Sequence, residues 1–225
     1  MYWLPDDEIV FPAPQYADEQ GVLAIGGDLS PERLILAYQN GIFPWFNEDE
    51  PIVWWAPDPR FVLYPEELRV SKSMRQVLRR DTFQITYDTD FRSVIKNCQQ
   101  IKREEQDGTW ITNDMYEAYV KLHEMGLAHS VEVWQNEELV GGLYGISFGR
   151  CFFGESMFAK VSNASKAGFI TFVQNLESLG FDMIDCQTET PHLHSLGADF
   201  ISRADFMKYL ADNNKKETWV GKWSF

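Results

Sequence analysis

Two carboxylates stand inside apolar, strand-like stretches of this 225-residue chain. Glu155 lies in FFGESMF (152–158), and Asp185 lies in MIDCQ (183–187), two residues before Gln187. Burial of an unpaired carboxylate is costly, so these acids must be paired or must take part in chemistry. Side chains at positions i and i+2 of a strand share a face, which predicts that Asp185 and Gln187 point the same way. Acids in this setting can hold a cationic substrate or tune a proton acceptor.

A purely structural role is the alternative interpretation of the two acids. Each could cap a helix or pair with Lys160 or Lys166, and the spacing does not decide between structure and chemistry. Metal binding has little support, because the H-x-H of His192 and His194 has no third ligand at a recognisable spacing. We therefore expect no metal site.

The composition provides material for a sizeable core and limits the class of protein. Hydrophobic residues make up 44% of the chain, and the absence of a run of about 18 apolar residues predicts no membrane span. The N-terminus, MYWLPDDEIVFP, has no basic n-region and no continuous apolar h-region, so we expect no signal peptide. The three cysteines are widely spaced and odd in number, which favours a reduced, cytoplasmic protein.

Charge is distributed unevenly along the chain. The formal net charge of −14 by itself argues against a nucleic-acid partner. Residues 1–60 hold eleven acids and two bases, whereas residues 69–103 hold nine bases and three acids. Lys72, Arg75 and Arg79 fall on one face of a predicted helix. This basic segment is either a solvated helix face or a local phosphate-binding patch.

The elements that must position these residues can be predicted from periodicity. Ser30 and Gly41 bound a short helix as N-cap and C′ residue. Alternation from residue 129 to 158, with turn signals between the apolar runs, predicts three antiparallel strands joined by hairpins. The predicted helices cover 31–40, 70–80, 90–103, 112–126, 163–179 and a segment opening at Ser202. Further strands are predicted near 83 and over 181–187, and residues 195–200 lead to a last strand or turn. This order implies an α/β (α+β) fold, a mixed sheet with flanking helices.

Four tryptophans lie in segments that resemble ordered loops. They are Trp45, Trp54, Trp55 and Trp110. Stacking of a nucleobase on such a ring is worth about 1–3 kcal/mol. A core or domain-interface position is the alternative for each of them.

Several ordered blocks of the sequence resemble the leucyl/phenylalanyl-tRNA–protein transferase family. They include GVLAIGGDLSPERLILAYQNGIFPWF (21–46), PIVWWAPDPRFVL (51–63), GTWIT (108–112), HSVEVW (129–134), ELVGGLYG (138–145), GESMF (154–158), NASK (163–166), IDCQ (184–187) and SLGA (195–198). The resemblance runs from about residue 8 to the end of the chain. It implies a small N-terminal α/β domain over residues 1–62 and a GNAT-like catalytic domain over residues 63–225.

The resemblance also implies a reaction. Leucine or phenylalanine, and methionine less well, would move from aminoacyl-tRNA to the N-terminal Arg or Lys of a protein, marking it for N-end rule degradation. The implied partners are Leu-tRNA, Phe-tRNA and the acceptor protein or peptide, with no cofactor, no membrane and a monomeric enzyme. The acetyltransferase motif for coenzyme A, [QR]-x-x-G-x-[GA], is missing from MFAKVSNASKAG (157–168), which argues against that cofactor.

The resemblance assigns roles to individual residues. Asp185, Gln187 and Glu155 would be catalytic, with Asp185 acting through Gln187 as a proton relay. Alternatively, the acids only bind the acceptor cation, and the ribose 2′-hydroxyl or water moves the proton. The donor amino acid and the 3′-terminal adenosine would be bound by Trp45, Trp110, Leu143, Phe152, Phe169, Phe172, Leu176, Ile184 and Ser195. The phosphates of the acceptor stem would be bound by Lys72, Arg75, Arg79 and Arg80.

The chain departs from the family pattern in three places. The segment 102–110 is longer, position 143 is Leu where the family has Met, and the segment 188–195 is acidic and rich in His. Two other functions are alternatives to this transferase reaction. Aminoacyl-tRNA transferases that build peptidoglycan bridges share the fold but are usually much longer chains. A non-catalytic tRNA-binding module would not need Asp185, Gln187 and Glu155 together in apolar strands.

Overall fold

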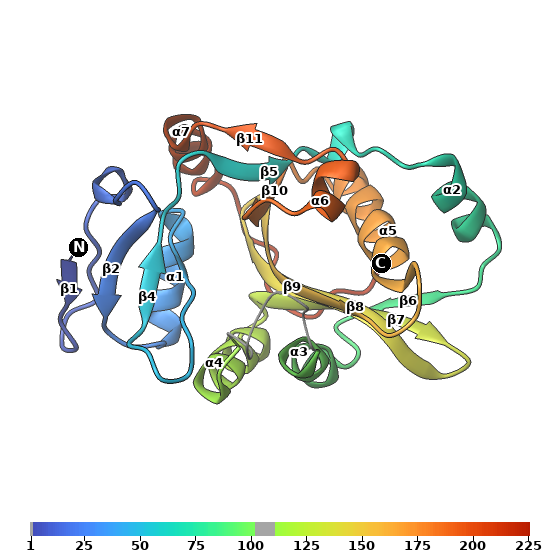
Figure 1. Cartoon of the computed structure of the whole chain (residues 1–225), viewed down its shortest axis with the longest axis horizontal. Coiled ribbons are helices and arrows are strands. Elements are labelled where there is room, and N and C mark those ends of the chain that lie inside the picture. Colours follow the sequence, from blue (N-terminus) through green and yellow to red (C-terminus); the bar gives the residue numbers. More distant parts are fainter. Residues whose placement is uncertain (1, 102–110) are drawn as a thin grey trace.

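The computed structural model describes residues 2–101 and 111–225, whose strands form two sheets (Figure 1). The smaller sheet has the order β1–β2–β4–β3, built from β1 (Tyr2–Leu4), β2 (Val22–Gly26), β4 (Val53–Trp55) and β3 (Phe43–Pro44). Helix α1 (Pro31–Gln39) follows β2. It begins as predicted, because the side chain of Ser30 accepts a hydrogen bond from the backbone of Arg33.

The larger sheet has seven strands in the order β11–β5–β10–β9–β8–β7–β6. Its strands are β5 (Arg60–Leu63), β6 (Gln84–Tyr87), β7 (Ala128–Gln135), β8 (Glu138–Phe148), β9 (Cys151–Ala159), β10 (Met183–Gln187) and β11 (Asp199–Ile201). Only β9 and β10 pair in parallel, and all other neighbours in this sheet are antiparallel. The predicted hairpins of residues 129–158 are therefore confirmed, as is the mixed character of the sheet.

Helices cover both faces of the larger sheet. Figure 1 shows α3 (Phe91–Gln100) and α4 (Asn113–Glu124) beneath it, and α5 (Ala164–Ser178) on the opposite face. Helix α2 (Lys72–Arg79) stands at one side, beyond α5. The predicted α/β class is thus confirmed. Among the described residues, no helix has the length and apolar character that would let it span a bilayer.

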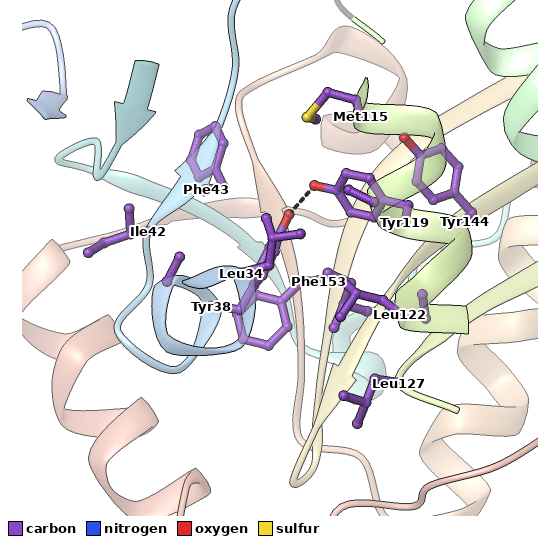
Figure 2. Close-up of a cluster of buried hydrophobic side chains, with 14 of the residues drawn as sticks. Leu34, Tyr38, Ile42, Phe43, Met115, Tyr119, Leu122, Leu127, Tyr144 and Phe153 are labelled. Carbon is purple, nitrogen blue, oxygen red and sulfur yellow. Dashed lines mark hydrogen bonds between the residues drawn. The ribbon is translucent and has the colours of Figure 1, made fainter. Parts of the chain in front are cut away.

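The small sheet is joined to the rest of the chain by a shared apolar core. Figure 2 shows Leu34 and Tyr38 of α1 meeting Tyr119 and Leu122 of α4 and Phe153 of β9. A second core lies around α5 and contains Phe152, Phe172 and Trp223 among its buried residues. The elements from both parts of the chain therefore support one another through packed side chains.

Strand β5 and helix α6 were not predicted from the sequence. Strand β5 pairs with β10 and β11, so residues 60–63 belong to the larger sheet, and the proposed domain boundary after residue 62 falls inside this strand. Helix α6 (Pro191–Ser195) has five residues, with the side chain of Thr190 as its N-cap. Helix α7 (Arg203–Asn213) begins after Ser202, as expected. Two 3-10 turns, Pro14–Tyr16 and Pro65–Glu67, complete the described elements.

Candidate active site

The larger sheet opens between its two parallel strands. Pairing of β9 with β10 ends at Phe153 and Asp185, although β9 continues to Ala159 and β10 to Gln187. A cavity of about 370 Å³ lies at this opening. Gly154 stands at the point of divergence, and a Cβ built there would lie 3.6 Å from the carbonyl oxygen of Asp185. The two acids singled out in the sequence both line this cavity.

Glu155 is held by three hydrogen-bond donors from three separate elements. The hydroxyl of Tyr38 in α1 donates to Oε1 at 2.8 Å, and that of Tyr119 in α4 is 2.9 Å from Oε2. The side-chain amide of Gln187 donates to Oε1 at 2.8 Å. The two phenolic oxygens lie 2.5 Å from each other, the contact dashed in Figure 2. The buried carboxylate of Glu155 is therefore fully hydrogen-bonded and not unpaired.

Two opposing influences act on the pKa of Glu155. Burial raises it, the hydrogen bonds from Tyr38, Tyr119 and Gln187 lower it, and the charge of Asp185 raises it by a smaller amount. The net pKa is about 7. Burial and the neighbouring Glu155 raise the pKa of both tyrosines well above the usual value, so they stay neutral donors. A carboxyl group that titrates near neutral pH can change its charge or take up a proton at the pH of the cell.

Asp185 is engaged in a different way. Its Oδ1 accepts a hydrogen bond from Nε of Arg60 at 2.8 Å, and its Oδ2 accepts one from Nη2 at 2.6 Å. Both side chains are fully buried, at 1% and 0% exposure. The guanidinium also lies 4.7 Å from the ring centre of Phe43 and 4.8 Å from that of Phe206. The ion pair therefore links β10 to β5, to the small sheet and to α7.

The predicted alternation from Asp185 to Gln187 does not hold. The pairing of β10 with β5 shifts register between these residues, and Gln187 has a φ of 61°. Oδ1 of Asp185 accepts a hydrogen bond from the backbone N–H of Gln187 at 3.0 Å, while the Gln187 side chain goes to Glu155. Asp185 thus fixes the backbone from which Gln187 reaches the second acid.

Four of the six apolar residues assigned to the donor pocket line the cavity. They are Leu143, Phe152, Phe169 and Ile184. Phe172 packs behind Phe152, with ring centres 4.7 Å apart, and Leu176 is fully buried in the same core. All six residues therefore lie in or next to the cavity wall. Four of them form the wall, and Phe172 and Leu176 pack behind it.

The remaining wall comes from the segment after β10. Thr190, His192 and Leu193 line the cavity at α6. Burial and the charge of Lys166 lower the pKa of His192, which keeps its imidazole neutral. Ser195, the residue assigned from this segment, is exposed, and its hydroxyl donates to the carbonyl of His192 at 2.7 Å. It is not among the residues that line the cavity.

The two tryptophans assigned to the adenosine are placed differently. Trp45 lies beside the small sheet, 36% exposed, with its ring centre 5.5 Å from that of Trp55. It does not line the cavity. Trp110 lies outside the described residues.

The four basic residues assigned to tRNA lie on or directly after α2. Lys72, Arg75, Arg79 and Arg80 are all exposed, whereas Met74 on the same helix is buried. In the part of the chain that the structure describes, no acidic side chain forms an ion pair with any of the four. Their charge is therefore available to a polyanion.

Residues 145–149 read GISFG, which matches the G-x-S-x-G pattern of serine hydrolases. The serine of that pattern normally stands on a sharp strand-to-helix turn. Ser147 instead lies inside β8 and is fully buried. It is not a candidate nucleophile.

Three residues that organise this site were not predicted from the sequence. Arg60, Tyr38 and Tyr119 contact the two acids, yet each comes from an element distant in sequence. The only local signal was the pair of acids itself, since a buried carboxylate needs partners from somewhere in the fold.

Solved structures with some likeness to this chain include acetyltransferases. An aminoglycoside acetyltransferase from an uncultured soil metagenomic sample is 13% identical, with a TM-score of 0.39, over 65% of this chain and 97% of its own. A GCN5-related N-acetyltransferase-like protein from Streptococcus suis is 12% identical, with a TM-score of 0.37, over 80% and 67%.

Sequence comparisons are much closer. A family model described as leucyl/phenylalanyl-tRNA protein transferase matches residues 62–211, and one for the N-terminal domain of that protein matches residues 27–58. The leucyl/phenylalanyl-tRNA–protein transferase of Flavobacterium johnsoniae is 60% identical over 210 residues, which are 93% of this chain and 99% of that protein. The one of Pseudomonas putida is 54% identical over 224 residues, 97% and 99% of the two chains. This chain belongs to the leucyl/phenylalanyl-tRNA protein transferase family.

Proposed function

We propose that this transferase moves leucine or phenylalanine, and methionine less well, from aminoacyl-tRNA to the N-terminal arginine or lysine of an acceptor protein. Its family membership supports transfer of an aminoacyl group from tRNA to protein. The observation that carries the choice of acceptor is Glu155, a carboxylate held by three neutral donors at the edge of a largely apolar cavity. The modified protein would then enter the N-end rule degradation pathway.

The apolar wall suits the side chain of the donor amino acid. Leu143, Phe152, Phe169 and Ile184 offer no charged group to it. We expect this pocket to disfavour donors that branch at Cβ, such as valine and isoleucine. Discrimination between apolar side chains is worth only about 1–3 kcal/mol per methylene. Leucine and phenylalanine would therefore be accepted together, with some transfer of methionine.

The acidic edge suits the acceptor. An N-terminal arginine or lysine carries an α-ammonium and a side-chain cation, and ionised Glu155 can pair with one of them. The α-amino group has an ordinary pKa of about 7.7–8.0, so part of it is already neutral near pH 7. The main requirement on the enzyme is then to hold the amine and the ester carbonyl in contact.

The reaction exchanges an ester for an amide. The amine nitrogen attacks the carbonyl carbon of the aminoacyl ester, the bond from that carbon to the ribose oxygen breaks, and the ribose hydroxyl regains a proton. Glu155, whose pKa is about 7, can take up the proton that the amine releases. Water or the ribose 2′-hydroxyl can complete the transfer to the leaving oxygen.

Asp185 contributes to this scheme by positioning. Its oxygens accept hydrogen bonds from Arg60 and from the backbone of Gln187, whose side chain in turn donates to Glu155. Its charge also raises the pKa of Glu155. We therefore assign Asp185 and Gln187 to holding and orienting Glu155. This differs from a relay in which Asp185 itself accepts a proton.

The exposed bases of α2 suit the phosphates of the tRNA acceptor stem. Contacts of this kind position the RNA without reading its sequence, which fits an enzyme that uses several tRNAs. Because the donor is charged tRNA, we infer a cytoplasmic enzyme, and we expect it to act as a monomer.

The test is transfer of radiolabelled leucine from Leu-tRNA to two peptides that differ only in an N-terminal Arg or Ala, at low salt. Label on the Arg peptide alone is the expected result. The Glu155→Gln variant should bind tRNA normally and lose most of this transfer. Equal labelling of both peptides would contradict the proposed acceptor, and labelling of neither would contradict the proposed reaction.

A further inference from the structure

The last twelve residues form a strap that returns to the larger sheet after α7. We define the C-terminal strap as residues 214–225. The backbone N–H of Gly221 donates to the carbonyl of Gly126 at 3.0 Å, and Arg150 donates to the carbonyl of Glu217 at 3.1 Å. The strap lies outside the residues 62–211 that match the family model of the catalytic part.

A buried aspartate anchors the strap at Trp223. Oδ2 of Asp88 accepts a hydrogen bond from the backbone N–H of Trp223 at 2.7 Å. The same carboxylate contacts Nδ1 of His129 and the N–H of Ser130, each at 2.8 Å. The indole lies on the His129 ring, with ring centres 3.7 Å apart and an angle of 11°. Trp223 is only 5% exposed, so its position is fixed from several sides.

Trp223 lies directly behind the proposed donor pocket. Its ring centre is 6.2 Å from that of Phe152, which lines the cavity, and 6.1 Å from that of Phe172, which supports Phe152. Protein interiors are close-packed, so the space available to Phe152 depends on what stands behind it. A smaller side chain at position 223 would let the Phe152 ring move back and deepen the pocket.

We propose that Trp223 is a specificity-determining residue that sets the depth of the donor pocket through Phe152. This inference rests on the proposed function, because it takes the cavity as the site of the donor side chain. Trp223 does not touch the donor. It acts by holding the ring that does.

The variant Trp223→Leu tests the inference, with Trp219→Leu as the matched control. Trp219 belongs to the same strap and packs against Arg150 at 4.8 Å and against Phe181 at 6.0 Å. Phe181 also packs against Trp223 at 5.8 Å, so this control shares one partner of Trp223 while Phe152 and Phe172 keep their contacts with Trp223. The measurement is the ratio of kcat/KM for Phe-tRNA to kcat/KM for Leu-tRNA, with one Arg-initiated peptide as acceptor. Because a deeper pocket favours the longer side chain, Trp223→Leu should raise this ratio about three- to tenfold. Trp219→Leu should leave it within about twofold of the wild-type ratio.

A second measurement separates this inference from the proposed function. Phenylalanyl- and leucyl-adenosine with an amide in place of the ester should bind the pocket without any acceptor. The ratio of their Kd values should shift in the same direction. A wild-type protein that binds both compounds but transfers neither amino acid would contradict the function alone. A folded Trp223→Leu protein with unchanged ratios, or equal shifts in both variants, would overturn the inference. Should Trp223→Leu not fold, Trp223→Phe is measured in the same way, and unchanged ratios again overturn it.

Discussion

Arg60 and Asp185, 125 residues apart in the sequence, form a buried ion pair with two hydrogen bonds of 2.8 and 2.6 Å. The pair joins the start of β5 to the end of β10, at the opening where Glu155 is held. Removal of one partner from such a pair costs about 3–5 kcal/mol, because the other charge stays buried and unpaired. Loss of activity in an Asp185 variant is therefore not, by itself, a sign that Asp185 moves a proton.

We expect Asp185→Ala to lower the free energy of unfolding by about 3–5 kcal/mol and to abolish transfer. The double variant Arg60→Met/Asp185→Leu should recover much of this stability, since apolar residues of similar size often replace a buried pair at little cost. It should remain poor in transfer, because the backbone of Gln187 has lost its anchor. Denaturant unfolding and transfer assays on the same preparations measure both effects.

The charge-neutral variant Asp185→Asn distinguishes a proton relay through Asp185 from a positioning role. This variant also leaves the buried charge of Arg60 unpaired, so we expect Asp185→Asn to lose stability and transfer together. A proton relay requires the carboxylate itself, so wild-type stability with no transfer would support the relay and contradict the positioning role. Salt-dependent tRNA binding serves as the control for folding in all three proteins.

The pKa of Glu155 makes a prediction about stability. It is about 7 in the folded protein against an ordinary 4.5, so the native state binds more protons than the unfolded chain between these values. The free energy of unfolding should therefore fall as pH rises from 4.5 to 7 and level off above 7. Allowing for solvent in the cavity, we expect this carboxyl to account for about 1–3 kcal/mol of the total decrease in the free energy of unfolding over this pH range.

Glu155→Gln should remove that contribution, so its stability relative to the wild type should rise between pH 5 and pH 8. Chemical denaturation at the two pH values measures the difference. Glu138→Gln, at an exposed position of β8, controls for the loss of one negative charge. Parallel stability curves for wild type and Glu155→Gln would contradict a titration of Glu155 in this range.

Tyr38→Phe should change the pH dependence of transfer. The hydroxyl of Tyr38 donates to Glu155 at 2.8 Å and so stabilises the ionised form. Its removal should raise the pKa of Glu155 further, moving the rising limb of kcat/KM for the peptide about one pH unit upward. Tyr209→Phe removes a phenol that donates to the carbonyl of Arg150, away from Glu155, and should not move the limb. An unshifted limb in Tyr38→Phe would show that Glu155 does not control it.

Much of the fold was predictable because its signals are local. The side chains of Ser30, Ser71, Thr112 and Ser202 each accept a hydrogen bond from the first turn of a helix, where the sequence predicted helix starts. Gly41 and Gly126 have positive φ values at helix ends, as their placement after apolar stripes indicated. Short elements such as β5 and α6 offer too few residues for a period to appear.

The site was predictable only in part. The two acids stood out as polar residues in apolar strands, but their partners did not, since Arg60 and Tyr38 lie 125 and 117 residues away from them. Strand alternation also failed at Gln187, where a left-handed backbone ends the regular strand. Alternation of side chains between the two faces of a sheet holds only within a regular strand. Functional residues often lie at strand ends, where this regularity is lost.

The exposed bases at α2 give a prediction about the salt dependence of tRNA binding. Arg79 and Arg80 are exposed and form no ion pair with any acid in residues 2–101 and 111–225. If both contact phosphates, Arg79→Ala/Arg80→Ala should reduce the slope of log K against log salt by about 2, one for each contact. Binding of Leu-tRNA and Phe-tRNA should weaken alike, because phosphate contacts carry no sequence information, and kcat at saturating tRNA should persist. Lys208→Ala, an exposed lysine on α7, should leave the slope unchanged. Equal slopes for the double variant and wild type would assign the tRNA surface to another part of the chain.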